Sequence, residues 1–296
     1  MKACLPYGLL WLRRKYKSKI KQQKLGKFSR IELFTAKVFK EKFIETDSDG
    51  KNRFNFNGAF IPDISEGDMA EYLTLTRVFS DSFMFSVLFN ENYDKKFVEI
   101  MDLYMHEGPY GYKDGDFDVT VKRNDIVIDA GAWIGDFSAY VASKGACAYA
   151  FEPGNTAFQV LEKTAEMNHG GKIYPVKKGL GDKNYETFFT HSLGHSAGGT
   201  IKTEITTGDK VEITSLDKFV EENNIEKIDF IKADIEGAEN DMLVGAKNVL
   251  KTYQPKLVIC TYHKPDDPET LAKTILEINP KYKIVQLRMK LFACVV

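Results

Sequence analysis

The stretch that most constrains the fold is IVIDAGAWIGDF, residues 126–137, in which an apolar run passes through an acid into a loop with two glycines. Its first residues have the length and β-branched composition of a buried strand. Gly131 and Gly135 follow, and glycine lets the backbone turn freely and approach a neighbouring group closely. The helix expected at about 135–143 would offer free N–H groups at its start. This unit predicts a ligand site beyond the strand, with packing as the alternative explanation of the glycines.

Residues 115–296 continue this alternation of strand and helix. Apolar runs of strand length lie at 147–152, 172–177, 227–234 and 255–262, and helix-length patterns separate most of them. Strands that alternate with helices form a mostly parallel sheet with helices on both faces. We therefore predict an α/β domain with a doubly wound, Rossmann-like sheet and a ligand at the carboxyl ends of its strands.

Two further patterns add strands to this domain. ETFFTH (186–191) and KVEITSLD (210–217) have the composition of extra strands inserted after the third unit. Residues 282–296 hold two short apolar runs around a turn. The second pattern predicts an antiparallel hairpin that closes the sheet at its edge.

Residues 1–114 lack the alternation and are interpreted as a mainly helical accessory region. Segments 31–43 and 71–89 have apolar residues at helical spacing, and the turn-rich segment 47–58 between them predicts a hairpin. Residues 1–30 form a basic arm with ten Lys or Arg and no acid, which leaves a net charge of −11 on the rest of the chain. A basic arm on an acidic body favours an interaction segment over a surface that binds nucleic acid throughout.

The basic arm also bears on the location of the protein. Its apolar run, residues 4–12, is shorter than the about 20 residues that span a bilayer, and basic residues follow it, whereas a signal peptide has them in front. The arm is expected either to rest on an anionic membrane surface or to dock on its own domain. Four cysteines without CxxC spacing indicate reduced thiols. We expect a cytoplasmic protein, either free or in peripheral contact with the inner face of the membrane.

The acids around the glycine loop indicate the charge of the ligand. The pattern is D-x-G-x-x-x-G from Asp129 to Gly135, not the G-x-G-x-x-G of a dinucleotide site. Asp129 and Asp136 would repel a pyrophosphate and attract a cationic ligand. Glu152 ends the next apolar run, twenty-one residues after Gly131, where a carboxylate can accept both ribose hydroxyls. The alternative role for Glu152 is to cap the helix that follows.

Charged residues also crowd the end of the fourth apolar run, in IKADIEGAEND. Lys232, Asp234 and Glu236 would point the same way along an extended segment, because side chains alternate. Burying three charges without partners is costly, so a position at a ligand site explains them better than a position in the core. Glu239 is expected only to favour the start of the next helix through the helix dipole.

Several segments together resemble the FkbM family of class I S-adenosylmethionine-dependent methyltransferases. They are VIDAGAWIGDFSAYVA, AYAFEPG, LDKFVEENNIEKIDFIKADIEGAE and the segment around His263, and the resemblance covers about 115–295. It implies S-adenosylmethionine as the cofactor. One departure is Trp133, where the family more often has Asn. A Trp ring there would cover the sulfonium through a cation–π contact.

The resemblance also implies which residues form the site. The cofactor would be held by Asp129, Gly131, Ala132, Trp133, Gly135, Glu152, Leu180, Gly181, Asp234 and Tyr110. His263, just past the fifth run, would be the general base, helped by Asp234 and Glu236, since a reference pKa of about 6.5 suits neutral pH. Acceptor-binding residues would be His195, Ser196 and Lys232. No metal is expected, because no tight ligand spacing supports one.

The predicted function is therefore methyl transfer to a hydroxyl. The acceptor would be a sugar, a glycan or a related small molecule, and not a nucleic acid. Two alternatives are a nicotinamide-dependent dehydrogenase on a similar sheet and a catalytically silent module that docks partners or a membrane through the basic arm. The sequence leaves the oligomeric state and the identity of the acceptor open.

Overall fold

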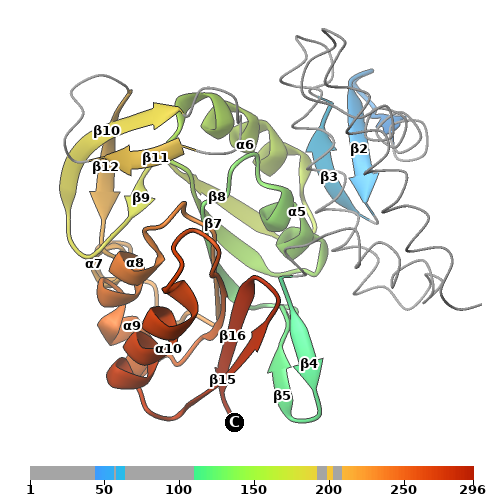
Figure 1. Cartoon of the computed structure of the whole chain (residues 1–296). Coiled ribbons are helices and arrows are strands. Elements are labelled where there is room, and N and C mark those ends of the chain that lie inside the picture. Colours follow the sequence, from blue (N-terminus) through green and yellow to red (C-terminus); the bar gives the residue numbers. More distant parts are fainter. Residues whose placement is uncertain (1–43, 57, 64–109, 192–198, 203–208) are drawn as a thin grey trace, which may run out of the picture.

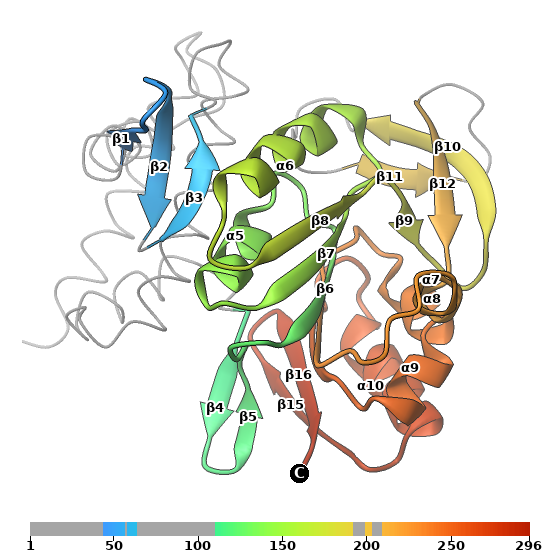
Figure 2. The ribbon, with the colours of Figure 1, turned by 180° about the vertical axis from the view of Figure 1, so that it is seen from behind.

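The computed structural model describes residues 44–56, 58–63, 110–191, 199–202 and 209–296 (Figures 1 and 2). Its central element is a seven-stranded sheet of order β15-β16-β14-β13-β6-β7-β8. The strands are β6 (Ile126–Ala130), β7 (Cys147–Phe151), β8 (Lys172–Val176), β13 (Phe230–Ala233), β14 (Lys256–Cys260), β15 (Tyr282–Leu287) and β16 (Lys290–Val295). Strands β14, β13, β6, β7 and β8 are parallel, and the β15–β16 hairpin joins β14 antiparallel. The predicted doubly wound sheet and its antiparallel edge hairpin are confirmed.

The strand order reverses between β6 and β13. The chain runs outward from β6 through β7 and β8 and then returns to β13 on the other side of β6. The two strands are in register through Ala130 and Ala233, and the N–H of Asp234 donates to the carbonyl of Ala130 at 3.1 Å. In doubly wound sheets ligands bind outside the carboxyl ends of the strands at such a reversal. The loops that begin at Gly131 and Asp234 therefore occupy the expected site.

Helices cover both faces of the sheet (Figures 1 and 2). One face is covered by α7 (Leu216–Glu222), α8 (Glu239–Val244), α9 (Lys247–Thr252) and α10 (Asp267–Ile278), and the other by α5 (Asp136–Ser143), α6 (Asn155–Met167) and the hairpin of β4 (Tyr112–Asp114) and β5 (Phe117–Val119). Ile231 packs in the first core and its neighbour Phe230 in the second. Successive strand residues point to opposite faces, so each parallel strand is apolar on both sides.

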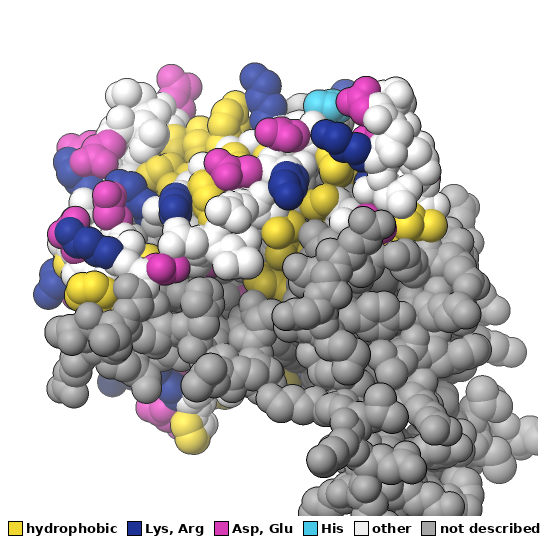
Figure 3. Space-filling model, turned by 90° about the horizontal axis from the view of Figure 1, so that it is seen from above, with side chains coloured by type: hydrophobic (Ala, Val, Ile, Leu, Met, Phe, Trp, Pro, Cys, Tyr) yellow, Lys and Arg dark blue, Asp and Glu magenta, His cyan; other side chains and the backbone are white. Residues whose placement is uncertain are grey.

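A smaller sheet stands beside the central one, with order β11-β10-β12-β9. Its strands are β9 (Gly179–Leu180), β10 (Tyr185–His191), β11 (Gly199–Lys202) and β12 (Asp209–Thr214). Strands β10 and β12 confirm the two inserted strands that the sequence predicts. Seen from above Figure 1, the described surface mixes acidic, basic and hydrophobic side chains (Figure 3). None of the helices in the described ranges is long and apolar enough to cross a bilayer.

The described part of the accessory region is an antiparallel sheet of β1 (Ile44–Thr46), β2 (Asn52–Phe56) and β3 (Ala59–Pro62). It confirms the predicted hairpin. Strand β3 contacts α5 and α6, and the side chain of Asn168 bonds both the N–H and the C=O of Phe60, at 2.9 and 2.7 Å. The basic arm and the helices predicted at 31–43 and 71–89 lie outside the described residues. The boundary predicted after residue 114 falls at the end of β4, inside the β4–β5 hairpin, and stays a prediction.

Candidate functional site

The two glycines of the loop after β6 are required by the contacts of the chain with itself. Gly131 has φ +73°, and a Cβ there would lie 1.9 Å from the carbonyl oxygen of Asp234. Gly135 has φ +85°, and its Cβ would lie 2.7 Å from Leu161 Cδ1 in α6. Both positions combine a left-handed backbone with a close neighbour, which only glycine tolerates. Packing accounts for the glycines, and their approach to a ligand stays a prediction.

Asp129 and Lys232 form a buried ion pair beneath this loop. Asp129 Oδ1 lies 3.0 Å from Lys232 Nζ, and Asp129 Oδ2 accepts a hydrogen bond from Ser138 Oγ at 2.6 Å. Lys232 Nζ also donates to the carbonyl of Gly131 at 2.7 Å. Burial opposes the charge on Lys232, but the carboxylates of Asp129, Asp234 and Asp136 outweigh it and raise the Lys232 pKa.

This ion pair changes the charge argument made from the sequence. The negative charge of Asp129 is balanced inside the chain, and its side chain is fully buried. Asp129 is therefore not a free carboxylate turned toward a ligand. The ammonium of Lys232 contacts the glycine loop at the carbonyl of Gly131, and the Lys232 side chain is 4% exposed. The cofactor role of Asp129 and the acceptor role of Lys232 stay predictions.

Glu152, at the end of β7, orders the outer part of the glycine loop. Its Oε2 accepts the N–H of Trp133 at 3.0 Å, and its Oε1 accepts the N–H of Gly154 at 2.7 Å. Burial raises the pKa of Glu152 to about 7 in spite of these two bonds. Trp133 has φ 50°, a left-handed conformation that is strained for a residue with a side chain. Glu152 thus holds the strained residue, and its predicted ribose contact stays a prediction.

Asp136 is the first residue of α5 and lies close to the same loop. Its Oδ1 accepts the N–H of Phe137 at 2.8 Å, and its side chain is almost completely buried. Burial raises the pKa of Asp136 to about 6. At neutral pH this carboxylate is largely ionised, so it adds negative charge at the reversal of the sheet.

Asp234, just after β13, is held by two tyrosines. Tyr110 donates its hydroxyl to Oδ2 at 2.7 Å, and Tyr262 donates to Oδ1 at 2.9 Å. Burial would raise the pKa of Asp234, but the charge of Lys232 and the hydrogen bond from Tyr110 lower it. The buried ammonium of Lys290 lies 4.0 Å from the centre of the Tyr110 ring. Asp234 is therefore a fixed carboxylate that stays ionised.

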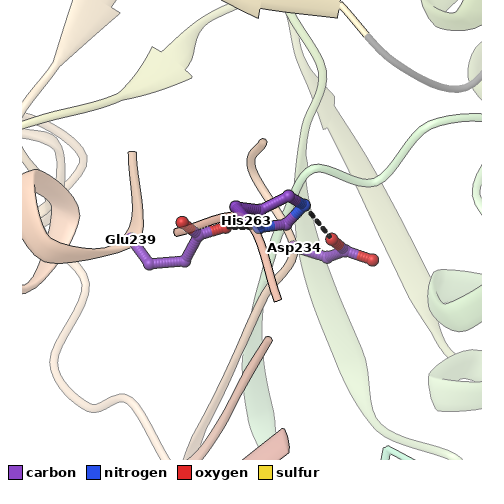
Figure 4. Close-up of side chains that lie close together, drawn as sticks. All are labelled: Asp234, Glu239 and His263. Carbon is purple, nitrogen blue, oxygen red and sulfur yellow. Dashed lines mark ion pairs between the residues drawn. The ribbon is translucent and has the colours of Figure 1, made fainter. Parts of the chain in front are cut away.

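His263 follows β14 and lies among three carboxylates, of which Figure 4 shows those of Asp234 and Glu239. Its Nδ1 is 3.0 Å from Glu239 Oε1, and its Nε2 is 3.5 Å from Asp234 Oδ1 and 3.6 Å from Glu236 Oε2. Burial would lower the pKa of His263, but Glu239, Asp234 and Glu236 raise it. Glu236 is the most exposed of the four side chains, at 35%, and has a left-handed φ of 55°. The structure thus brings together the three residues predicted to be catalytic.

Glu239 is a site residue that the sequence reasoning missed. It was expected only to favour the helix dipole, and it does begin α8. Its carboxylate is also buried and in contact with His263 from a position twenty-four residues earlier in the chain. The pattern of acids after β13 marks the region, but no local spacing shows that Glu239 and His263 meet.

The other predicted residues are placed as follows. Ala132 is buried, and its N–H donates to the carbonyl of Phe151 at 2.9 Å. Leu180 packs in the core that includes Phe151, and the N–H of Gly181 donates to Thr214 at 3.1 Å. The structure therefore places Leu180 and Gly181 at the end of β9. His195 and Ser196 lie outside the described residues.

Asp234, Glu239 and His263 also lie within the distances of a metal site, with one donor atom from each inside 4.8 Å of the others. Their directions do not suit a shared ion, because the imidazole lies between the two carboxylates and turns one nitrogen to each (Figure 4). A metal ion needs its donors to converge on one point. The cluster is better described as a histidine bridging two acids, and the absence of a metal stays a prediction.

Comparison with known proteins identifies the family of the chain. The family model described as the Methyltransferase FkbM domain matches residues 129–294, more than half of the chain. The chain is similar to the hexuronic acid methyltransferase AglP of Haloferax volcanii, with 28% identity over 166 residues, covering 56% of this chain and 67% of the relative. It is also similar to Methyltransferase 1 of Beauveria bassiana, with 26% identity over 188 residues, covering 54% of this chain and 74% of that protein.

Among solved structures, the FkbM methyltransferase of Methylobacillus flagellatus aligns with 22% identity and a TM-score of 0.48. The alignment covers 78% of this chain and 62% of the other. The chain thus spans less than two thirds of that protein.

Proposed function

The chain belongs to the FkbM methyltransferase family, and from that membership we propose that it transfers a methyl group from S-adenosylmethionine to a hydroxyl of a sugar, a glycan or a related small molecule. The observation that carries the proposal is the placement of His263 between Asp234 and Glu239 at the carboxyl ends of the central strands. Family membership gives no support to a nicotinamide-dependent dehydrogenase or to a catalytically silent module.

The charge of the site fits a cationic cofactor. S-adenosylmethionine carries a sulfonium and an ammonium, and when bound it supplies an electrophilic methyl group. With Asp129 and Lys232 paired, the nearby cations are Lys290 and, when protonated, His263. Against them stand five carboxylates, those of Asp136, Glu152, Asp234, Glu236 and Glu239. This excess of negative charge attracts a cation and disfavours a pyrophosphate.

The residues that would hold the cofactor surround the reversal of the sheet. The backbone of the glycine loop would hold the methionine part, and Glu152 would accept the ribose hydroxyls. Asp234 and Tyr110 would flank the sulfonium, and Leu180 or Gly181 would lie by the adenine. The full set of residues proposed to hold the cofactor is Asp129, Gly131, Ala132, Trp133, Gly135, Glu152, Leu180, Gly181, Asp234 and Tyr110.

The surroundings of His263 favour a hydroxyl acceptor over a carboxylate. A neutral hydroxyl must lose its proton as it is methylated, and a positioned histidine is suited to accept it. Protonated His263 would then be stabilised by Asp234 and Glu236. A carboxylate acceptor needs no base, and it would be repelled by these two acids. A sugar hydroxyl therefore fits better than an acid group, although the relative AglP is named for a hexuronic acid.

A labelling experiment tests the proposal through two measurements, the incorporation of label and its stability to base. The full chain is incubated with methyl-labelled S-adenosylmethionine and a panel of neutral hexosides and hexuronosides, and the product is treated with mild base. Label in a methyl ether survives this treatment, whereas label in a methyl ester is released. Base-stable label is expected. Base-labile label would show that a carboxylate is the acceptor.

The base itself is tested by His263→Ala. Turnover should fall by about 10²–10⁴-fold, because proton transfer to a positioned base contributes that much. The affinity for S-adenosylhomocysteine, measured by isothermal titration, should stay within a few-fold, since His263 is not among the residues that would hold the cofactor. His169→Ala, at an exposed histidine after α6, is the matched control and should leave turnover unchanged. Unchanged turnover in His263→Ala would remove His263 from the mechanism.

The basic arm supports a proposal on location. Its apolar run and its ten basic residues suit a cytoplasmic enzyme that reaches a glycan at the inner face of a membrane. The full chain should sediment with anionic vesicles. Replacing Arg13, Arg14, Lys15 and Lys17 by Gln should abolish this sedimentation, and equal sedimentation of both proteins would reject the contact.

A further inference from the structure

Glu239 is a buried carboxylate with few partners. It is fully buried at the start of α8. Its Oε1 accepts the N–H of Ile235 at 2.9 Å and lies 3.0 Å from His263 Nδ1. Within the described residues, its Oε2 has no hydrogen-bond partner. A buried acid is costly unless it is paired, so the contact with His263 is the main compensation for this charge.

We propose that Glu239 is a positioning residue that holds the Nδ1 proton of His263 and leaves Nε2 free to accept the proton of the methyl acceptor; this inference rests on the proposed function. The distances from the two ring nitrogens to the neighbouring carboxylates indicate which nitrogen carries the proton. The 3.0 Å separation at Nδ1 is within hydrogen-bond range, and a small rotation of the ring would align its N–H with Glu239, whereas 3.5 and 3.6 Å at Nε2 are too long for a bond. In a neutral imidazole only one nitrogen carries a proton. The proton therefore lies on Nδ1, toward Glu239.

The proton balance of the step follows from this arrangement. The acceptor O–H bond breaks, and its proton moves to Nε2. The oxygen's electron pair forms the bond to the methyl carbon, and the pair of the carbon–sulfur bond stays on sulfur. His263 becomes an imidazolium with both nitrogens protonated, and Glu239 on one side and Asp234 and Glu236 on the other face its positive charge.

Several charged groups besides Glu239 surround the ring and set its acidity. Asp234 and Glu236 approach from the loop after β13, and Asp234 is tied to Lys232, Tyr110 and Tyr262. The Tyr262 ring also lies 4.2 Å from the imidazole, centre to centre. Glu239 is the nearest acid and makes the largest upward contribution to the His263 pKa. Its removal should lower that pKa, while the other groups remain in place.

Two substitutions separate the position of the proton from the charge of Glu239. Glu239→Gln can keep its amide oxygen at the Oε1 position, where it accepts from Ile235 and His263, and put its NH₂ at the unpartnered Oε2 position. It should keep most of kcat and move the acidic limb of the pH profile of kcat/KM to lower pH. Glu239→Leu loses the acceptor and should lower kcat by about 10²-fold. KM for S-adenosylmethionine should stay within about three-fold in both.

The outcomes distinguish this inference from the proposed function. Loss of turnover in His263→Ala together with full kcat in Glu239→Leu would overturn the role of Glu239 alone. Full turnover in both would overturn the base itself. An unshifted acidic limb in Glu239→Gln would also contradict the inference.

A measurement on the unchanged protein remains decisive if Glu239→Leu does not fold. Nitrogen NMR of histidine-labelled chain at alkaline pH should show His263 with its proton on Nδ1, identified by the signal that His263→Ala lacks. A proton on Nε2 would overturn the inference.

Discussion

The two loops at the reversal of the sheet contain similar charged groups but balance them differently. Beneath the loop after β6, Asp129 and Lys232 are 3.0 Å apart and at most 4% exposed. Beside the loop after β13, His263 from the loop after β14 is 3.0 Å from Glu239 but 3.5 Å or more from Asp234 and Glu236, and exposure rises to 35% at Glu236. The Asp129–Lys232 pair, called the inner pair, is buried and its two charges are matched. The cluster of Asp234, Glu236, Glu239 and His263, called the outer cluster, is partly exposed and has more acids than cations.

This difference separates structural charges from chemical ones. In the inner pair, each charge has an opposite charge and a further hydrogen bond. In the outer cluster, three acids surround one histidine, and a proton or a cationic ligand lowers the excess of negative charge. Substitutions in the inner pair should therefore affect stability, and those in the outer cluster should affect catalysis.

The largest expected effect on stability is that of Lys232→Met. It leaves Asp129 buried and unpaired, and breaking a buried pair costs about 3–5 kcal/mol of the free energy of unfolding. Urea unfolding measures the loss. The double variant Asp129→Asn, Lys232→Met removes both charges and should recover most of the stability. Glu236→Gln, in the outer cluster, should change stability by less than about 1 kcal/mol. Equal losses of unfolding free energy in Lys232→Met and Glu236→Gln would show that the inner pair and the outer cluster do not differ in their contribution to stability.

A smaller effect is expected from the glycines of the two loops. Gly131→Ala should cost about 3–4 kcal/mol, because its Cβ would overlap the carbonyl of Asp234 in a left-handed backbone. Gly237 also has a positive φ, +100°, but its Cβ would lie 3.5 Å from Lys264 Cε, an ordinary contact. Gly237→Ala should therefore cost only about 1–2 kcal/mol. Thermal and urea unfolding of both variants compare the loops directly, and a reversed order would contradict the closed packing of the inner loop.

The fold could be predicted from the sequence because its strands are short apolar runs separated by helical patterns. Strand β13 lies within the run predicted at 227–234, and β10 and β12 within or beside the inserted strands. Burial on both faces makes such runs nearly continuous in apolar residues. The alternation of strands and helices does not extend to the accessory region. There, the prediction that the structure confirms is the hairpin within residues 44–63.

Most members of the candidate site could be predicted, but Glu239 and the contacts among the members could not. The alternation rule placed Lys232, Asp234 and Glu236 on one side of an extended segment, but β13 ends at Ala233, and Glu236 already has a left-handed backbone. Lys232 instead contacts Asp129, whose place across the sheet depends on the strand order. Glu239 meets His263 for the same reason. Single-sequence patterns give local direction, whereas these pairs depend on tertiary packing.

The smallest of the three effects on stability concerns Asp136, beside the inner pair. Burial raises its pKa to about 6 in the folded chain, from an ordinary 3.8. The folded state therefore binds the proton more tightly than the unfolded state, and stability falls as the pH rises from about 4 to 6. Asp136→Asn keeps the oxygen that accepts from Phe137 and has no charge to bury. It should be more stable than the wild type by about 2 kcal/mol above pH 7 and lose this advantage near pH 4.

Urea unfolding of both proteins across this range measures the difference. An advantage that stays constant at every pH would show that Asp136 acts through packing and not through its charge. An advantage that disappears at low pH would instead confirm that burial governs this carboxylate, as expected where the neighbouring charges of Asp129 and Lys232 cancel. The Asp129–Lys232 pair would then differ from the cluster around His263 because, in that cluster, three acids face one histidine.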